Sequence, residues 1–201
     1  MKVYKLTDAQ NRTKGPTQWG ENVTHTAVGL AGQPLCSNGW IHFYVDPVLA
    51  VLMNPIHANF ISPNLWEAET GGEELHEPLK SGSRSLTTIK QIDLPKLTCV
   101  QVAAFGILCA RHVYKDANWQ KWANNWLNNI DRSRDAAADA AYAARAAAYA
   151  ARAAADAARA ARAARAARAA SHAAYAASHA AYAAYAPIDF VALAHKALTY
   201  K

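Results

Sequence analysis

The chain has 201 residues and a formal net charge of +6. About 50 residues near the C-terminus form an alanine-rich segment, so the rest has room for one compact domain of about 130 residues. The three cysteines, Cys36, Cys99 and Cys109, form no Cys-x-x-Cys pair and leave an odd number, which argues against a disulfide framework and a zinc site.

The sequence also argues against secretion and membrane insertion. The first ten residues, MKVYKLTDAQ, lack the apolar stretch of a signal peptide. The chain contains no run of about 20 uncharged apolar residues. We therefore expect a cytoplasmic protein without a membrane partner.

Residues 1–132 are predicted to form an α+β domain, with a small mixed or antiparallel sheet and packed helices. Met1–Thr7 alternates in hydrophobicity, and residues 8–39 indicate loops with at most a short strand. Trp40–Val45 gives the strongest strand signal, because it is aromatic and β-branched throughout. Two further strands are expected at residues 65–69 and 85–94, with Gly71-Gly72 as a turn between them.

Three helices are predicted in the same domain. Asp46-Pro47 is a typical helix start, and that helix is expected to run to about Met53, where Asn54-Pro55 ends it. A set of residues at three- and four-residue spacing predicts a second, amphipathic helix of about 15 residues from Thr98. They are Val102, Phe105, Cys109, His112 and Val113.

A third helix is predicted from about Asn118 to Asn129. Its apolar face would carry a stripe of large side chains, which we interpret as core packing against the sheet rather than a platform for a ligand or a base. The stripe consists of Trp119, Trp122, Trp126 and Ile130.

Residues 133–186 are predicted to form a helical rod. Alanine, the residue with the highest helix propensity, occupies 34 of the 51 positions from 136 to 186, and no Gly or Pro interrupts them. Heptads fill residues 140–160, and arginine triplets follow to Arg168. Because about 3.5 and 3.0 residues separate the polar positions in these two blocks, the face of bare alanine changes sides between them.

The rod suggests self-association. A continuous alanine face permits close helix–helix contact, so we expect a coiled-coil homo-oligomer formed through residues 136–186. The arginines of the triplets are spread around the helix, which favours only weak, non-specific nucleic-acid binding. Residues 187–201 are predicted to form a short amphipathic helix that docks onto the globular domain or a neighbouring subunit.

No strong catalytic motif is present, and the sequence predicts no metal site and no cofactor. The candidate ligand-binding residues are polar and aromatic groups beside the expected strands: Trp19, Asn22, His25, His57, Asn59 and Arg84. The candidate catalytic residues are His42, Tyr44, Glu67 and Glu69.

The runs TQWGENVTH, LCSNGWIHFYVDPVLAVLMNPIHANF, LWEAE and SLTTIKQIDLP resemble a family of small bacteriophage-encoded proteins of unknown function. The resemblance covers roughly residues 1–135 and, loosely, the tail. It implies an accessory protein of phage type that acts in the cytoplasm of a bacterial host.

The strand that ends in GWIHFY, followed at once by a helix that begins at Asp46-Pro47, is also similar to the middle of the ADP-ribosyltransferase-like fold. That similarity implies that His42, Tyr44 and Glu67 or Glu69 hold NAD. The first strand, VYKLT, lacks the His-Gly pair or Arg of that fold.

Three hypotheses follow from the sequence. The first is a non-catalytic binding module, oligomerised through the rod, that acts on a host protein or a small nucleotide-like ligand. The second is an ADP-ribosyltransferase-like or nucleotide-binding enzyme. The third is non-specific nucleic-acid binding by the arginine-rich tail.

Overall fold

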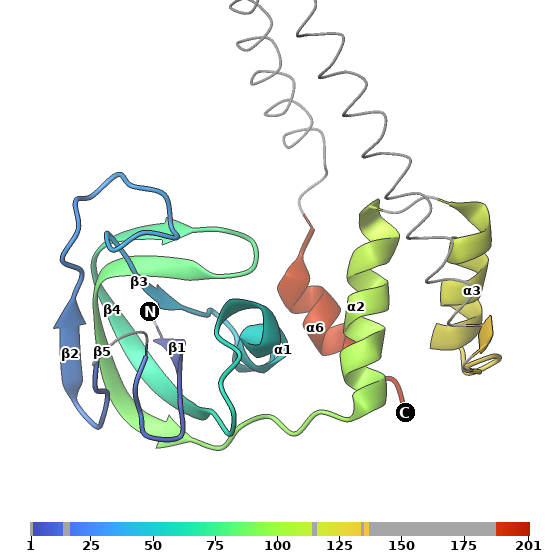
Figure 1. Cartoon of the computed structure of the whole chain (residues 1–201), viewed down its shortest axis with the longest axis horizontal. Helices are drawn as coiled ribbons and strands as arrows, with labels where there is room; N and C mark the ends of the chain where they lie inside the picture. The colour runs from blue at the N-terminus through green and yellow to red at the C-terminus, as the bar shows by residue number, and fades with distance from the viewer. Residues whose placement is uncertain (1, 14–16, 114–115, 134, 137–187) are drawn as a thin grey trace, which may run out of the picture. The chain divides into compact units, whose positions relative to one another are not determined.

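The computed structural model describes residues 2–13, 17–113, 116–133, 135–136 and 188–201 (Figure 1). These residues contain an antiparallel sheet and four helices, which confirms the α+β class. The predicted alanine-rich rod, the change of its alanine face and its self-association concern residues almost all of which lie outside the described ranges. The described residues divide between two units, one of residues 1–106 with 189–201 and one within residues 107–188.

The sheet has five strands, of which four follow the order β1 (Lys2–Thr7), β4 (Asn64–His76), β5 (Ser81–Ile92) and β2 (Val23–Thr26). The fifth, β3 (Ile41–Phe43), pairs with the first residues of β5. Beyond β3, Tyr44 exchanges two backbone hydrogen bonds of 2.8 Å with Tyr4. Strands β1, β4, β5 and β3 therefore form a closed circuit of hydrogen-bonded neighbours.

The strands expected at the start of the chain and at residues 40–45 are confirmed, as is the short strand between residues 8 and 39. The predicted turn at Gly71-Gly72 is wrong, because both glycines lie inside β4. Gly72 has a φ of 74°, and the pairing with β5 is irregular between Gly71 and Glu74. Glycine at positive φ here forms a bulge in a long strand, and the chain turns later, where Glu77 N–H donates to the Lys80 carbonyl.

The core of the sheet lies on the face that carries Val3 of β1. Here a small cluster of buried side chains packs together: Val3, Trp19, Phe43, Ala68 and Leu86. Because side chains alternate along a strand, Lys5 lies on the same face as Val3 and is only 7% exposed. Its Nζ lies 5.0 Å from the centre of the Trp19 ring and donates a 2.7 Å hydrogen bond to the His42 carbonyl. Burial lowers the pKa of Lys5 from 10.5 to about 7.

Helix α1 (Pro47–His57) begins where the sequence predicts. The Asp46 carboxylate accepts a 2.9 Å hydrogen bond from Leu49 N–H, and Pro47 occupies the first turn. The helix packs against β1 on one side and α6 on the other. Its predicted end at Asn54-Pro55 is wrong, since Pro55 lies inside the helix.

One more turn forms after Pro55 because Asn54 holds it. The carbonyl of Asn54 accepts from Ala58 and Asn59 N–H, and its side-chain amide makes two 3.0 Å hydrogen bonds with the backbone of Phe60. Proline removes one donor from a helix, but its fixed φ remains compatible with helical geometry.

The predicted C-terminal helix is present as α6 (Phe190–Ala197), which belongs to the first unit and packs against α1 there. Ala194 and Ala197 are buried. His195 Nε2 lies 2.7 Å from Asp46 Oδ2, and Gln101 Nε2 donates to the Leu198 carbonyl at 3.0 Å. The α1 N-cap therefore also anchors the last helix of the chain.

Helix α2 (Cys99–Val113) begins with a reciprocal cap, in which Thr98 and Gln101 each accept a hydrogen bond from the other's backbone N–H. The helix itself was predicted, but its buried face differs from the prediction because Val102 is 46% exposed. The buried residues are Ala104, Phe105, Ile107 and Leu108.

Helix α3 (Ala117–Leu127) in the second unit is also confirmed, with Asp116 as its N-cap. The predicted stripe is only partly buried. The buried residues of α3 follow i, i+4 and i+8 spacing instead: Trp119, Ala123 and Leu127. Ile130 lies beyond the helix end and is 71% exposed.

Lys5 gives a test of this core. The unfolded chain binds more protons than the folded chain between about pH 7 and pH 10.5, so the free energy of unfolding should rise across this window. Denaturant titrations at about pH 7 and about pH 10 should show a rise on the order of 3 kcal/mol in the unmodified protein relative to Lys5→Met. Lys90→Met, at an exposed position, should follow the unmodified protein. Parallel pH profiles for Lys5→Met and the unmodified protein would contradict the assignment.

Candidate functional site

Three of the predicted site residues lie on β3, directly after it and at the last residue of α1: His42, Tyr44 and His57. Phe43 points into the core, so His42 and Tyr44 lie on the opposite face of the strand. The Tyr44 hydroxyl lies 3.0 Å from His57 Nδ1 at the end of α1, and the two rings are stacked with centres 6.0 Å apart. The structure therefore brings a predicted catalytic residue and a predicted ligand-binding residue into direct contact.

His42 is held by the loop that precedes β3. Its Nε2 lies 2.5 Å from the carbonyl oxygen of Leu35, a fully buried residue. Gly82 pairs with His42 across the sheet, and a Cβ at Gly82 would lie 2.5 Å from the Leu35 side chain. The loop thus lies directly on β5, and glycine is required there because of the close approach.

Lys80 and Cys36 belong to the same region, and sequence reasoning missed both. Lys80 Nζ donates to Cys36 Sγ at 3.0 Å, although 44 residues separate them. Cys36 is exposed and immediately follows Leu35, while Lys80 precedes β5. Neither residue stands in a recognisable motif, and only the pairing of β3 with β5 brings them to His42.

Burial and positive charge keep both imidazoles neutral at neutral pH. Burial is the main cause that lowers the pKa of His42, and the charges of Lys80 and Lys5 lower it further, whereas the Leu35 carbonyl and Glu77 act in the opposite direction. The pKa of His57 is lowered by burial and by the charges of Lys80 and His42.

Burial also raises the pKa of Tyr44 to about 12, so the phenol is protonated at neutral pH. It can then donate to His57 Nδ1, which leaves the single proton of the neutral imidazole on Nε2. Lys80 has three N–H donors, of which Cys36 takes one. The region therefore presents hydrogen-bond donors, an arrangement that suits an acceptor-rich ligand.

The two predicted glutamates do not join these residues. Glu67 Oε1 lies 2.5 Å from Lys2 Nζ, and its Oε2 lies 3.6 Å from Lys90 Nζ. The hydrogen bond from Lys2 is the main cause that lowers the pKa of Glu67. Tyr4 of β1 pairs with Tyr44 on one side and with Glu67 on the other. The backbones of Tyr44 and Glu67 are therefore two strand spacings apart, roughly 10 Å. Glu69 lies further along β4, opposite Lys2.

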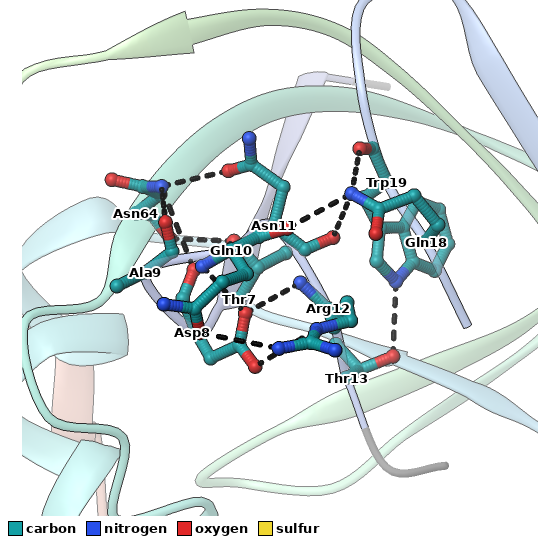
Figure 2. Close-up of polar contacts among 10 residues, drawn as sticks. All are labelled: Thr7, Asp8, Ala9, Gln10, Asn11, Arg12, Thr13, Gln18, Trp19 and Asn64. Atoms are coloured by element: carbon teal, nitrogen blue, oxygen red, sulfur yellow. Dashed lines mark hydrogen bonds and ion pairs between the residues drawn. The ribbon is translucent and has the colours of Figure 1, made fainter. Parts of the chain in front are cut away.

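Trp19 is a core residue, held by the loop that follows β1. Figure 2 shows this loop: Asp8 Oδ1 accepts from the backbone N–H of Gln10 and Arg12, and Trp19 N–H donates to the Asn11 carbonyl at 2.7 Å. The indole N–H of Trp19 donates to Thr13 Oγ1 at 2.9 Å. Trp19 is 3% exposed, so the predicted role in ligand binding is replaced by a role in packing.

His25 supports Trp19. Its ring meets the indole edge-on with centres 4.6 Å apart, and its Nε2 lies 2.8 Å from the Gln18 carbonyl oxygen. Asn22 and Asn59 are exposed and have φ values of 57° and 52°. Asparagine tolerates this left-handed conformation better than most residues, so both positions suit tight turns.

Arg84 is a structural anchor. Its guanidinium donates to three backbone carbonyls of the segment between β2 and β3, those of Ala27, Gly29 and Gly39. The predicted binding residue therefore fixes the loop that supplies Leu35 and Cys36.

Comparison with protein-family models, curated proteins and solved structures gives no match. Within the described residues, no three His, Cys, Asp or Glu side chains gather as a metal site. No helix in the described ranges is both long and apolar enough to cross a bilayer. The three cysteines are unpaired.

The charge of Lys80 gives a test of this geometry. Lys80→Gln removes a positive charge that lowers the pKa of both imidazoles, so the pKa of His42 and of His57 should rise. Titration of the imidazole signals by NMR measures both values, and Lys90→Gln is the matched control. An unchanged pKa for both histidines in Lys80→Gln would show that Lys80 does not lie beside them.

Proposed function

We propose that the chain is a non-catalytic binding module, an accessory protein of phage type in the cytoplasm of a bacterial host. The α+β domain binds a small nucleotide-like ligand or a host protein. Residues 136–186 hold several copies together and so raise the effective concentration of the binding sites.

The observation that carries this proposal is the group of donors at the junction of β3 and α1. His42, Tyr44 and His57 are fixed by contacts of 2.5–3.0 Å, and Lys80 contacts Cys36, the residue that follows the Leu35 to which His42 is bonded. Side chains that are already held in place lose little further freedom when a ligand binds, which favours affinity.

The enzyme alternative draws on the same residues. An ADP-ribosyltransferase-like reaction would need Glu67 or Glu69 next to the histidine and tyrosine, and Glu67 is engaged by Lys2 and Lys90 instead. This arrangement favours binding without turnover.

Calorimetry tests the binding role. The full-length protein is titrated with NAD, ADP-ribose and cyclic nucleotides, and each mixture is then analysed for turnover. We expect binding of at least one ligand, loss of that binding in His42→Ala, and unchanged ligand afterwards. Turnover that requires Glu67 would favour the enzyme instead. A second assay immobilises the protein and compares the host proteins retained by the unmodified chain and by His42→Ala. The proposal is wrong if no ligand binds and the two proteins retain the same host proteins.

The oligomer has a separate test. Size-exclusion chromatography with light scattering should give a mass of more than one subunit for the full-length chain. Ala144→Glu with Ala151→Glu places charge on the alanine face of the first block and should lower that mass. A full-length protein that remains monomeric at high micromolar concentration would exclude self-association through residues 136–186.

A further inference from the structure

We propose that His42, His57 and Lys80, here called the cationic cluster, bind the phosphate groups of a small anionic ligand, and that binding takes up protons at the two imidazoles. The inference rests on the proposed binding function and names the chemical class of its ligand.

The cationic cluster offers hydrogen-bond donors from each of its three residues. Tyr44 occupies His57 Nδ1, so the Nε2–H of His57 remains as a donor. Lys80 retains two N–H donors beside the one that contacts Cys36. His42 uses Nε2 on the Leu35 carbonyl and gains a second donor at Nδ1 when it is protonated. A phosphate group, with several acceptor oxygens and up to two negative charges, matches donors that come from three separate segments.

The charges of the cationic cluster also favour an anion. Lys80 lowers the pKa of both imidazoles, and His42 lowers that of His57, so these groups repel one another when charged. An anion between them would reverse this effect, because it stabilises each protonated form.

Three further groups face the cationic cluster, of which two favour an anion and one opposes it. Lys5 adds a positive group behind His42, and Tyr44 is a neutral donor. Glu77, an exposed residue in the turn between β4 and β5, acts on His42 in the opposite direction and would repel an anion. Glu77 therefore offers a variant that should strengthen binding.

The side chains of the cationic cluster are preorganised. His42, His57 and Lys80 are each tied to a different partner, and all three are half-buried. Half-buried charges are screened less by salt than exposed ones, so an anion there gains more than it would at a surface lysine. Lys90, which pairs with Glu67 on the sheet, is the exposed lysine for comparison.

The experiment uses the full-length protein and four probes: sulfate, pyrophosphate, ADP and adenosine. Sulfate is a dianion that does not titrate near neutral pH, so its affinity reports protonation of the protein alone. We expect sulfate to bind more tightly at about pH 5.5 than at about pH 8, with a change of up to tenfold per pH unit for each proton taken up. The imidazole signals of His42 and His57 should shift in NMR spectra as sulfate binds.

Pyrophosphate and ADP distinguish the sources of the phosphate group. Both should bind, and adenosine should not. A preference for ADP over pyrophosphate would identify a nucleotide, and the reverse would identify a free polyphosphate. Either result supports the inference, whereas tight binding of adenosine alone would overturn it.

Three variants locate the site. Lys80→Gln should weaken binding of pyrophosphate about tenfold or more, Glu77→Gln should strengthen it, and Lys90→Gln should leave it unchanged. The inference is overturned if Lys80→Gln and Lys90→Gln bind pyrophosphate equally well, or if neither sulfate nor pyrophosphate binds. If another ligand or a host protein still binds in that case, the binding function stands and only the phosphate assignment fails.

Discussion

Two backbone hydrogen bonds between Tyr4 and Tyr44 close the sheet, and most of the first unit depends on them. They bring the end of β3 onto β1, so that Asp46 can start α1 against the sheet. Because Tyr44 is fixed by its backbone, its hydroxyl meets His57 at the far end of the same helix. Asp46 in turn contacts His195, so the last helix of the chain is anchored at the same junction.

This junction also explains why a polar cluster can exist on so small a domain. Arg84 holds the loop between β2 and β3. Because glycine has no Cβ, Leu35 of this loop can pack directly onto β5 at Gly82. Main-chain carbonyls accept hydrogen bonds from the side chains of His42 and Lys5. Without these bonds, burial of the two polar groups would destabilise the folded protein. Burial lowers the pKa of Lys5 to about 7, and the His42 carbonyl and the Trp19 ring give its amine partners within the core.

The sequence predicted the elements that local patterns control and missed those that depend on tertiary contacts. Asp46-Pro47 and the aromatic strand before it were sufficient to place β3 and the start of α1. The effect of Pro55 was not predictable, because the side chain of Asn54 stabilises the turn beyond it. Among the candidate site residues, His42, Tyr44 and His57 do lie together, while Trp19 and Arg84 support the scaffold. Lys80 and Cys36 could not be found from spacing, since only the register of β3 on β5 brings them to His42.

The account depends most directly on the contact between Tyr44 and His57, which sets the donors that the site presents. Long-range proton–nitrogen NMR spectra of the full-length protein at neutral pH report which ring nitrogen of His57 carries the proton. The structure predicts a bare Nδ1 that accepts from Tyr44 and a protonated Nε2, and it predicts that Tyr44→Phe mixes the two tautomers. A proton on Nδ1 in the unmodified protein, or a tautomer that Tyr44→Phe leaves unchanged, would contradict this account.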